Sequence, residues 1–167
     1  MGIYYKRLKQ RGIKMDIDLQ IVKTDKMIRK VRRVRAMIKQ AMANMDNQYA
    51  FTTSTIFRGN IFGDLIRNKR ADKLNSNINK VQKELLRLEA DLLIYDEDLA
   101  KNLRLPAKMA NPARVDGIFG DISLRTEMRY RQFDVAKSLR NVEKILDILE
   151  KDKKKLRFMK KSQKGLI

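Results

Sequence analysis

Apolar residues recur every three or four positions through the first third of this chain, and no proline or glycine interrupts them between residues 16 and 58. This spacing places one apolar stripe along a single face of an α-helix. It predicts a helix over residues 16–47, roughly 48 Å long. Two acidic residues, Asp16 and Asp18, suit the positive end of its dipole. The members of the stripe are Ile17, Ile21, Thr24, Ile28, Val31, Val34, Ile38, Met42 and Met45.

Two later segments carry apolar residues in alternating steps of four and three, the heptad spacing of coiled-coil-like packing. They predict helices over about 60–102 and 116–159. Pro106 and Pro112 cannot both lie in a regular helix, so residues 104–115 are the expected connection. Residues 47–60, rich in Thr and aromatics, are interpreted as a linker or a short strand-like segment. The helix-seam residues are Leu74, Ile78, Val81, Leu85, Leu88 and Leu92 in the second helix, and Val135, Leu139, Val142, Leu146 and Leu149 in the third.

The tetrapeptide Ile-Phe-Gly-Asp occurs at 61–64 and again at 118–121, in each case before a basic periodic segment. Residues 79–91 also match 140–152, at a spacing about one helical turn longer. We interpret these matches as two similar helical units packed as an antiparallel hairpin, by duplication or by chance. Two capping schemes remain open. Either Asp64 and Asp121 cap the helices, or Asn60 and Asp116 do and the helices begin earlier.

The sequence therefore predicts an all-α fold, an elongated antiparallel three-helix bundle with coiled-coil-like seams. Its second and third helices form the pseudo-repeated hairpin. The bundle is expected to occupy residues 16–160 as a single domain. A basic N-terminal arm precedes it over 1–15, and a basic flexible tail follows over 161–167. Met37, Met42 and Met45 fit a core better than an adaptable binding groove.

The chain has 39 Lys and Arg residues against 20 Asp and Glu, a net charge of +19. Such a charge favours polyanions, because phosphate binding releases counterions. Two dense basic segments are the predicted polyanion-binding residues. They are Lys23, Lys26, Arg29, Lys30, Arg32, Arg33, Arg35 and Lys39 in the first helix, and Lys153, Lys154, Lys155, Arg157, Lys160 and Lys161 near the C-terminus.

Histidine and cysteine are absent, which removes the usual zinc ligands, disulfides and the commonest general base. No phosphate-binding loop or nucleophile motif is present either. We therefore expect no enzymatic activity, no cofactor, no metal and no small-molecule substrate. The acidic run 96–98 is interpreted as a solvated helix end. Two alternatives are a contact with the basic face of another copy and a magnesium site with Asp91 or Glu89.

These observations predict a cytoplasmic, non-enzymatic protein that binds nucleic acid or the ribosome without sequence specificity. Tyr4, Tyr5 and Tyr130 stand among basic residues, where aromatics can stack on bases. A second hypothesis is a helical scaffold that acts through a protein partner or a homodimer. A third is a peripheral binder of acidic membranes through residues 1–14, with Ile3, Tyr4, Leu8 and Ile13 inward. No apolar run approaches the length that spans a bilayer.

Overall fold

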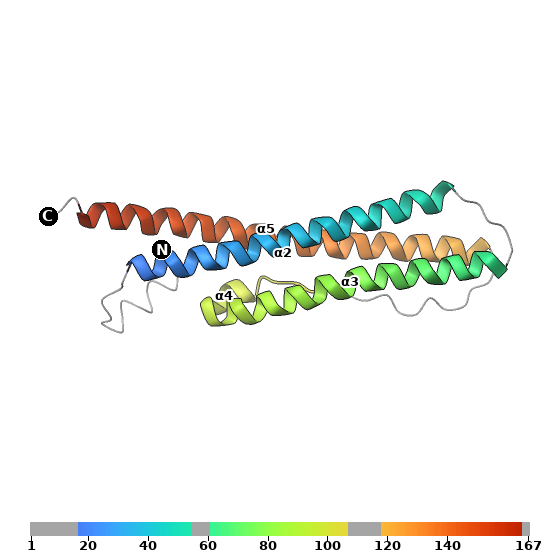
Figure 1. Ribbon diagram of the computed structural model, residues 1–167, viewed down its shortest axis with the longest axis horizontal. Coiled ribbons are helices and arrows are strands. Elements are labelled where there is room, and N and C mark those ends of the chain that lie inside the picture. The colour runs from blue at the N-terminus through green and yellow to red at the C-terminus, as the bar shows by residue number, and fades with distance from the viewer. Residues whose placement is uncertain (1–16, 55–60, 107–117, 165–167) are drawn as a thin grey trace.

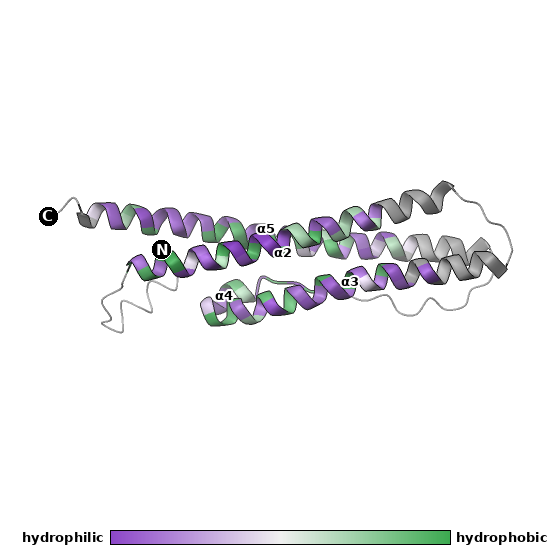
Figure 2. Ribbon diagram, viewed as in Figure 1, coloured by the Kyte–Doolittle hydropathy of each residue, from purple (hydrophilic) through white to green (hydrophobic). Residues whose placement is uncertain are grey.

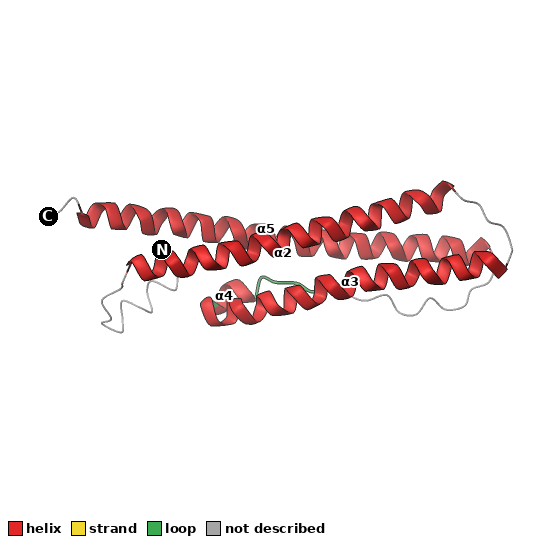
Figure 3. Ribbon diagram, viewed as in Figure 1, coloured by secondary structure: helices red, strands yellow, loops and turns green. Residues whose placement is uncertain are grey.

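The computed structural model describes residues 17–54, 61–106 and 118–164, and nearly all of them are helical. The helices are α2 (Ile17–Ser54), α3 (Ile61–Tyr95), α4 (Glu97–Ala100) and α5 (Ile118–Lys164). Figure 3 shows the helices and a short loop that follows α4, and no strand occurs within these ranges. The three long helices lie along one another and make an elongated molecule (Figure 1). The all-α prediction is confirmed.

Helix α2 continues to Ser54, past its predicted end near residue 47. The interpretation of 47–54 as a linker or strand is therefore wrong, while 55–60 lie outside the described residues. The physical reason is that no proline or glycine stands between residue 16 and Gly59. Thr and aromatic residues lower helix propensity by only a few tenths of a kcal/mol each, too little to end a helix. At the other end of the chain, the predicted flexible tail begins inside α5, which extends to Lys164.

Contacts between helices fix their directions. Asp18 pairs with Lys160, and Arg35 pairs with Glu143, so α5 runs antiparallel to α2. Lys30 pairs with Asp91 and the Thr24 hydroxyl shares a hydrogen bond with that of Tyr95, so α3 also runs antiparallel to α2. Helices α3 and α5 consequently run in the same direction (Figure 1). The predicted antiparallel hairpin of these two helices is wrong.

The chain reverses immediately after α3, which explains the parallel arrangement. Asp96 has an extended backbone, and its carboxylate accepts hydrogen bonds from the amides of Asp98 and Leu99, capping the one-turn helix α4. The predicted continuous helix over 60–102 is therefore broken at Asp96. The chain then returns along α3, since the Gln82 side-chain amide donates to the Pro106 carbonyl at 2.6 Å. The connection is long enough for α5 to start at the same end as α3.

The repeated tetrapeptide opens both of these helices. Ile61 is the first residue of α3 and Ile118 is the first residue of α5, so both helices begin before the aspartates of the motif. This arrangement excludes caps at Asp64 and Asp121 and favours the second scheme. Its capping residues, Asn60 and Asp116, lie outside the described residues. The two copies of the motif lie at the same end of the molecule (Figure 1).

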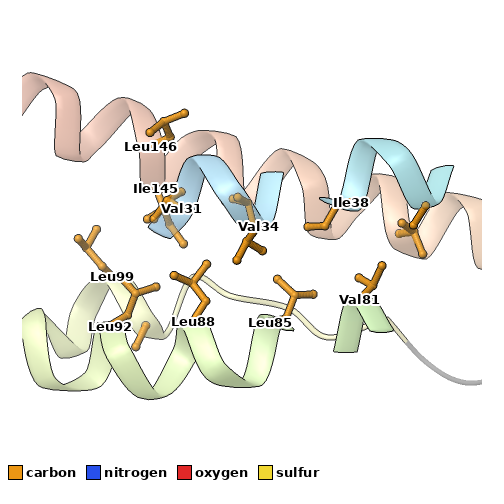
Figure 4. Packing of buried hydrophobic residues seen from close by; sticks show 14 of the residues in the cluster. Val31, Val34, Ile38, Val81, Leu85, Leu88, Leu92, Leu99, Ile145 and Leu146 are labelled. Atoms are coloured by element: carbon orange, nitrogen blue, oxygen red, sulfur yellow. The ribbon is translucent and has the colours of Figure 1, made fainter. Parts of the chain in front are cut away.

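One hydrophobic core runs between the long helices, and Figure 4 shows side chains of α2, α3 and α5 meeting there together with Leu99 of α4. The other faces of the helices are mostly hydrophilic (Figure 2), although some large hydrophobic side chains are exposed there. The residues at the predicted seam positions of α3 are buried, and so are those of α5 except Leu139, which is partly buried against the same cluster. Thr24 is fully buried, and its hydroxyl is satisfied by the Gln20 carbonyl and by Tyr95.

Candidate polyanion-binding face

The antiparallel packing of α2 and α5 brings together the two basic segments that are far apart in the sequence. Lys153 pairs with Asp25, and Arg32 pairs with Glu150 at 2.8 Å. The basic residues of α2 therefore lie beside those of the C-terminal half of α5. The sequence predicted both sets of residues, but it did not predict that they share one surface.

Half of the predicted binding cations lie in ion pairs, in which an acid offsets their charge. Most of these pairs cross between helices, and Lys155 pairs with Asp152 within α5. Partly exposed pairs contribute little stability, but each acid lowers the positive potential around its cation. The interhelical pairs are Lys30–Asp91, Arg32–Glu150, Arg35–Glu143, Lys39–Glu143, Lys153–Asp25 and Lys160–Asp18. Among described residues, no ion pair holds Lys23, Lys26, Arg29, Arg33, Lys154, Arg157 or Lys161.

An open groove of about 420 Å³ lies between α2 and α5 where these segments meet. Its lining holds more cations than acids, and each acid already pairs with one of the cations. Arg29, Lys154 and Arg157 remain available to an anion, and all three are exposed. The lining residues are Asp25, Ile28, Arg29, Arg32, Glu150, Lys153, Lys154 and Arg157.

The pKa of Asp25 is lowered by several cations of the groove that lie near its carboxylate. The hydrogen bond from Lys153 holds the pKa of Asp25 below its ordinary value, against a smaller opposing effect of burial. The charges of Lys153, Arg157 and Arg29 lower this pKa further. Asp25 is therefore ionised at neutral pH and neutralises one lysine. Arg29 and Arg157 act on it from opposite helices, which places both beside the same groove.

Glu143 links α5 to α2 and gives a pH-dependent contribution to stability. The hydrogen bond from Arg35 lowers the pKa of Glu143 from its ordinary 4.5, and the charges of Arg35 and Lys39 act in the same direction. Because the pKa of Glu143 is lower in the folded protein than in the unfolded chain, its ionised carboxylate stabilises the fold. This stabilisation is fully present at pH values above the pKa of the unfolded chain. It is lost as the pH falls through the pKa of the folded protein.

We therefore expect Glu143→Gln to lower the free energy of unfolding at pH 7 by about 0.2–1 kcal/mol, the range of partly exposed pairs. At pH 2 the variant and the unchanged protein should be equally stable. Urea unfolding at both pH values measures this difference. Glu89→Gln is the matched control, because Glu89 makes no ion pair with another described residue. An equal loss at both pH values would contradict the electrostatic explanation.

The acidic run 96–98 has local roles in the structure. Asp96 caps α4, and Lys101 lies 3.2 Å from Glu97 and 3.3 Å from Asp98. Asp91, a ligand of the alternative magnesium site, pairs with Lys30 of α2 at 2.5 Å. Within residues 17–54, 61–106 and 118–164, no cluster of acidic residues is arranged to hold a metal ion.

Some predicted features lie outside the described residues, and others were missed. Tyr4, Tyr5 and the segment 1–14 lie outside the described residues, whereas Tyr130 is 65% exposed. The exposure of Phe133 and Phe158 was not predicted, because aromatic residues on helices usually pack into cores. The helices of the described segments are not long and apolar enough to cross a membrane. The sequence matches no family model and shows no significant match to curated proteins or solved structures.

Proposed function

We propose that this protein binds nucleic acid, either free or in the ribosome, without sequence specificity through the groove between α2 and α5. The observation that carries this proposal is the position of Arg29, Lys154 and Arg157 around one groove whose acids are already neutralised. A polyanion that enters the groove meets three unpaired cations from two helices. Both carboxylates in the lining, Asp25 and Glu150, are paired with a cation, so neither repels the polyanion with its full charge.

The chemistry of these side chains favours phosphate over base edges. A guanidinium group donates two parallel hydrogen bonds to one phosphate, and lysine acts as a point charge. Contacts to phosphate position a nucleic acid but carry no sequence information. Binding through the groove is therefore electrostatic and independent of sequence, and it weakens as salt rises.

The test is the salt dependence of binding by the nuclease-treated protein. Fluorescence anisotropy with a labelled 20-base-pair duplex, between 50 and 400 mM salt, gives the association constant. Three phosphate contacts predict that its logarithm falls with the logarithm of salt concentration at a slope of about −3 or steeper. No binding at the lowest salt concentration, or a slope near zero, would overturn the proposal.

A scaffold role is the second candidate, and exposed aliphatic residues on α3 favour it. Leu86, Leu93 and Ile94 are 51%, 54% and 89% exposed, and helical spacing places them on one side of α3. We propose that the long helices form a three-helix bundle with coiled-coil-like seams, which burial of the seam positions supports. Such a bundle presents this aliphatic side to a protein partner or a second copy. Light scattering during gel filtration at low and high salt distinguishes the candidates, since a scaffold dimer persists at high salt.

A further inference from the structure

The outward side of α5 carries three aromatic residues that do not pack into the core. Tyr130 is 65% exposed, Phe133 is 51% exposed and Phe158 is 72% exposed. Single exposed apolar residues are ordinary on protein surfaces. Three aromatic residues on one helix, each at least half exposed, form a more unusual surface, because a buried aromatic contributes far more to stability than an exposed one.

Basic residues continue the same side of α5 between these aromatics. From Tyr130 the steps of three and four residues that keep to one helix face lead through Phe133, Lys137, Arg140 and Lys144, and then to Lys151 and Phe158. Arg140, Lys144 and Lys151 are exposed. We call these seven residues the aromatic–basic stripe.

Two details define the electrostatics of the aromatic–basic stripe. The Lys137 ammonium lies over the Phe133 ring, 4.6 Å from its centre, so this lysine covers one face of the ring, and a base stacked on that face displaces it. Asp147 is an exposed acid between Lys144 and Lys151. Against this one acid the stripe has four cations, so it retains an excess of positive charge. Its cations suit a phosphate backbone.

The aromatic–basic stripe adjoins the groove. Lys154 lines the groove and lies one helical turn before Phe158, so a strand bound in the groove can continue onto α5. The stripe is about 42 Å long from Tyr130 to Phe158. At the spacing of stacked nucleotides, about 3.4 Å, this length corresponds to about 12 nucleotides.

We propose that the aromatic–basic stripe binds single-stranded nucleic acid by stacking unpaired bases on Tyr130, Phe133 and Phe158. Stacking on aromatics accepts every base, since each base has a π face, and cations along the same track hold the backbone. A duplex keeps its bases stacked on each other and offers them no face. The inference rests on the proposed function and adds a preference for single strands.

The experiment compares three labelled ligands at 100 mM salt by anisotropy: a 15-nucleotide oligothymidylate, an abasic 15-mer of the same charge, and a 15-base-pair duplex. The unchanged protein should bind the oligothymidylate at least about tenfold more tightly than the abasic strand, as expected for stacking on aromatics. This comparison requires no variant and cannot be confused with misfolding.

The triple variant Tyr130→Ala, Phe133→Ala and Phe158→Ala should bind the oligothymidylate no more tightly than the abasic strand, and its affinity for the duplex should stay unchanged. The matched control, Leu86→Ala, Leu93→Ala and Ile94→Ala, removes exposed apolar groups from α3 and should keep the preference for oligothymidylate. Circular dichroism of both variants checks their helicity.

The outcomes separate this inference from the proposed function. Equal binding of thymidylate and abasic strands by the unchanged protein overturns stacking and leaves electrostatic binding in place. If the α3 control loses the preference for oligothymidylate over the abasic strand, as the α5 variant does, stacking on the α5 aromatics is also overturned. An absence of binding to all three ligands overturns both proposals.

Discussion

Replacing Leu85 by alanine is expected to lower the free energy of unfolding by about 2–5 kcal/mol. Leu85 has no exposed surface and belongs to the hydrophobic cluster between the long helices (Figure 4). The loss combines the transfer free energy of the deleted methine and two methyl groups with the cost of the cavity that remains. Because domain stability is typically 5–15 kcal/mol, this single change removes a large share of it.

The adjacent residue supplies the control. Leu86 is 51% exposed, on the same helix and in the same turn. Leu86→Ala should change the free energy of unfolding by less than about 0.5 kcal/mol, as surface substitutions usually do. Both values come from urea unfolding followed by circular dichroism at 222 nm. Equal losses from the two substitutions would mean that α3 does not present the Leu85 side to the core.

Charge reversal at the groove is expected to weaken duplex binding by about 100-fold or more at 100 mM salt. The variant changes Arg29, Lys154 and Arg157 to glutamate, which replaces three attractive contacts by three repulsive ones. The slope of binding against salt should also become shallower by about 3, since three fewer phosphates are neutralised. Anisotropy with the same labelled duplex measures both effects.

The control must carry the same change in net charge. Lys73→Glu, Lys80→Glu and Lys83→Glu reverse three exposed lysines of α3, outside the groove. This variant should lose less than about tenfold in affinity, through the weaker overall field alone. If the two variants lose affinity equally, net charge and not the groove governs binding. Alanine versions of the groove substitutions test the same contacts without placing new acids beside Asp25 and Glu150.

Reversal of Arg32, Arg33 and Arg35, three neighbouring cations of the predicted binding set, would be a poorer test of binding than reversal at the groove. Arg32 and Arg35 each lie 2.8 Å from a glutamate of α5. Their reversal would place like charges across the α2–α5 interface as well as remove positive charge. A loss of binding in that variant would not separate contact with nucleic acid from disturbed helix packing.

The sequence predicted the helical class and the faces that the helices bury, because both depend on local periodicity. The stripe of α2 from Val31 to Met45 and the positions of α3 from Leu74 to Leu92 illustrate this. A step of three or four residues identifies one side of a helix whatever its neighbour is. The absence of proline and glycine likewise predicts long helices. The same absence accounts for the continuation of α2 to Ser54, where the Thr and aromatic residues suggested a linker.

The relative direction of the helices could not be predicted in the same way. Heptad spacing is equally compatible with parallel and antiparallel neighbours, and a connection that contains prolines can turn back at once or run the length of the bundle. Asp96 ends α3, and the Pro106 carbonyl contacts Gln82, but neither contact has a distinctive sequence pattern. The groove was missed for the same reason, since it depends on α5 lying antiparallel to α2.

The partnership of the first long helix with the last sets the order in which this protein can fold during synthesis. The Arg32–Glu150 pair joins residues 118 positions apart, and the Lys160–Asp18 pair joins residues 142 positions apart. At about 5–20 residues per second, the residues of α2 in these two pairs wait roughly 6–28 s for their partner residues in α5. During that interval α2 has only α3 to cover it, and its apolar stripe is open to chaperones or to other nascent chains. Early release of a truncated chain that lacks α5 would therefore yield an aggregation-prone product.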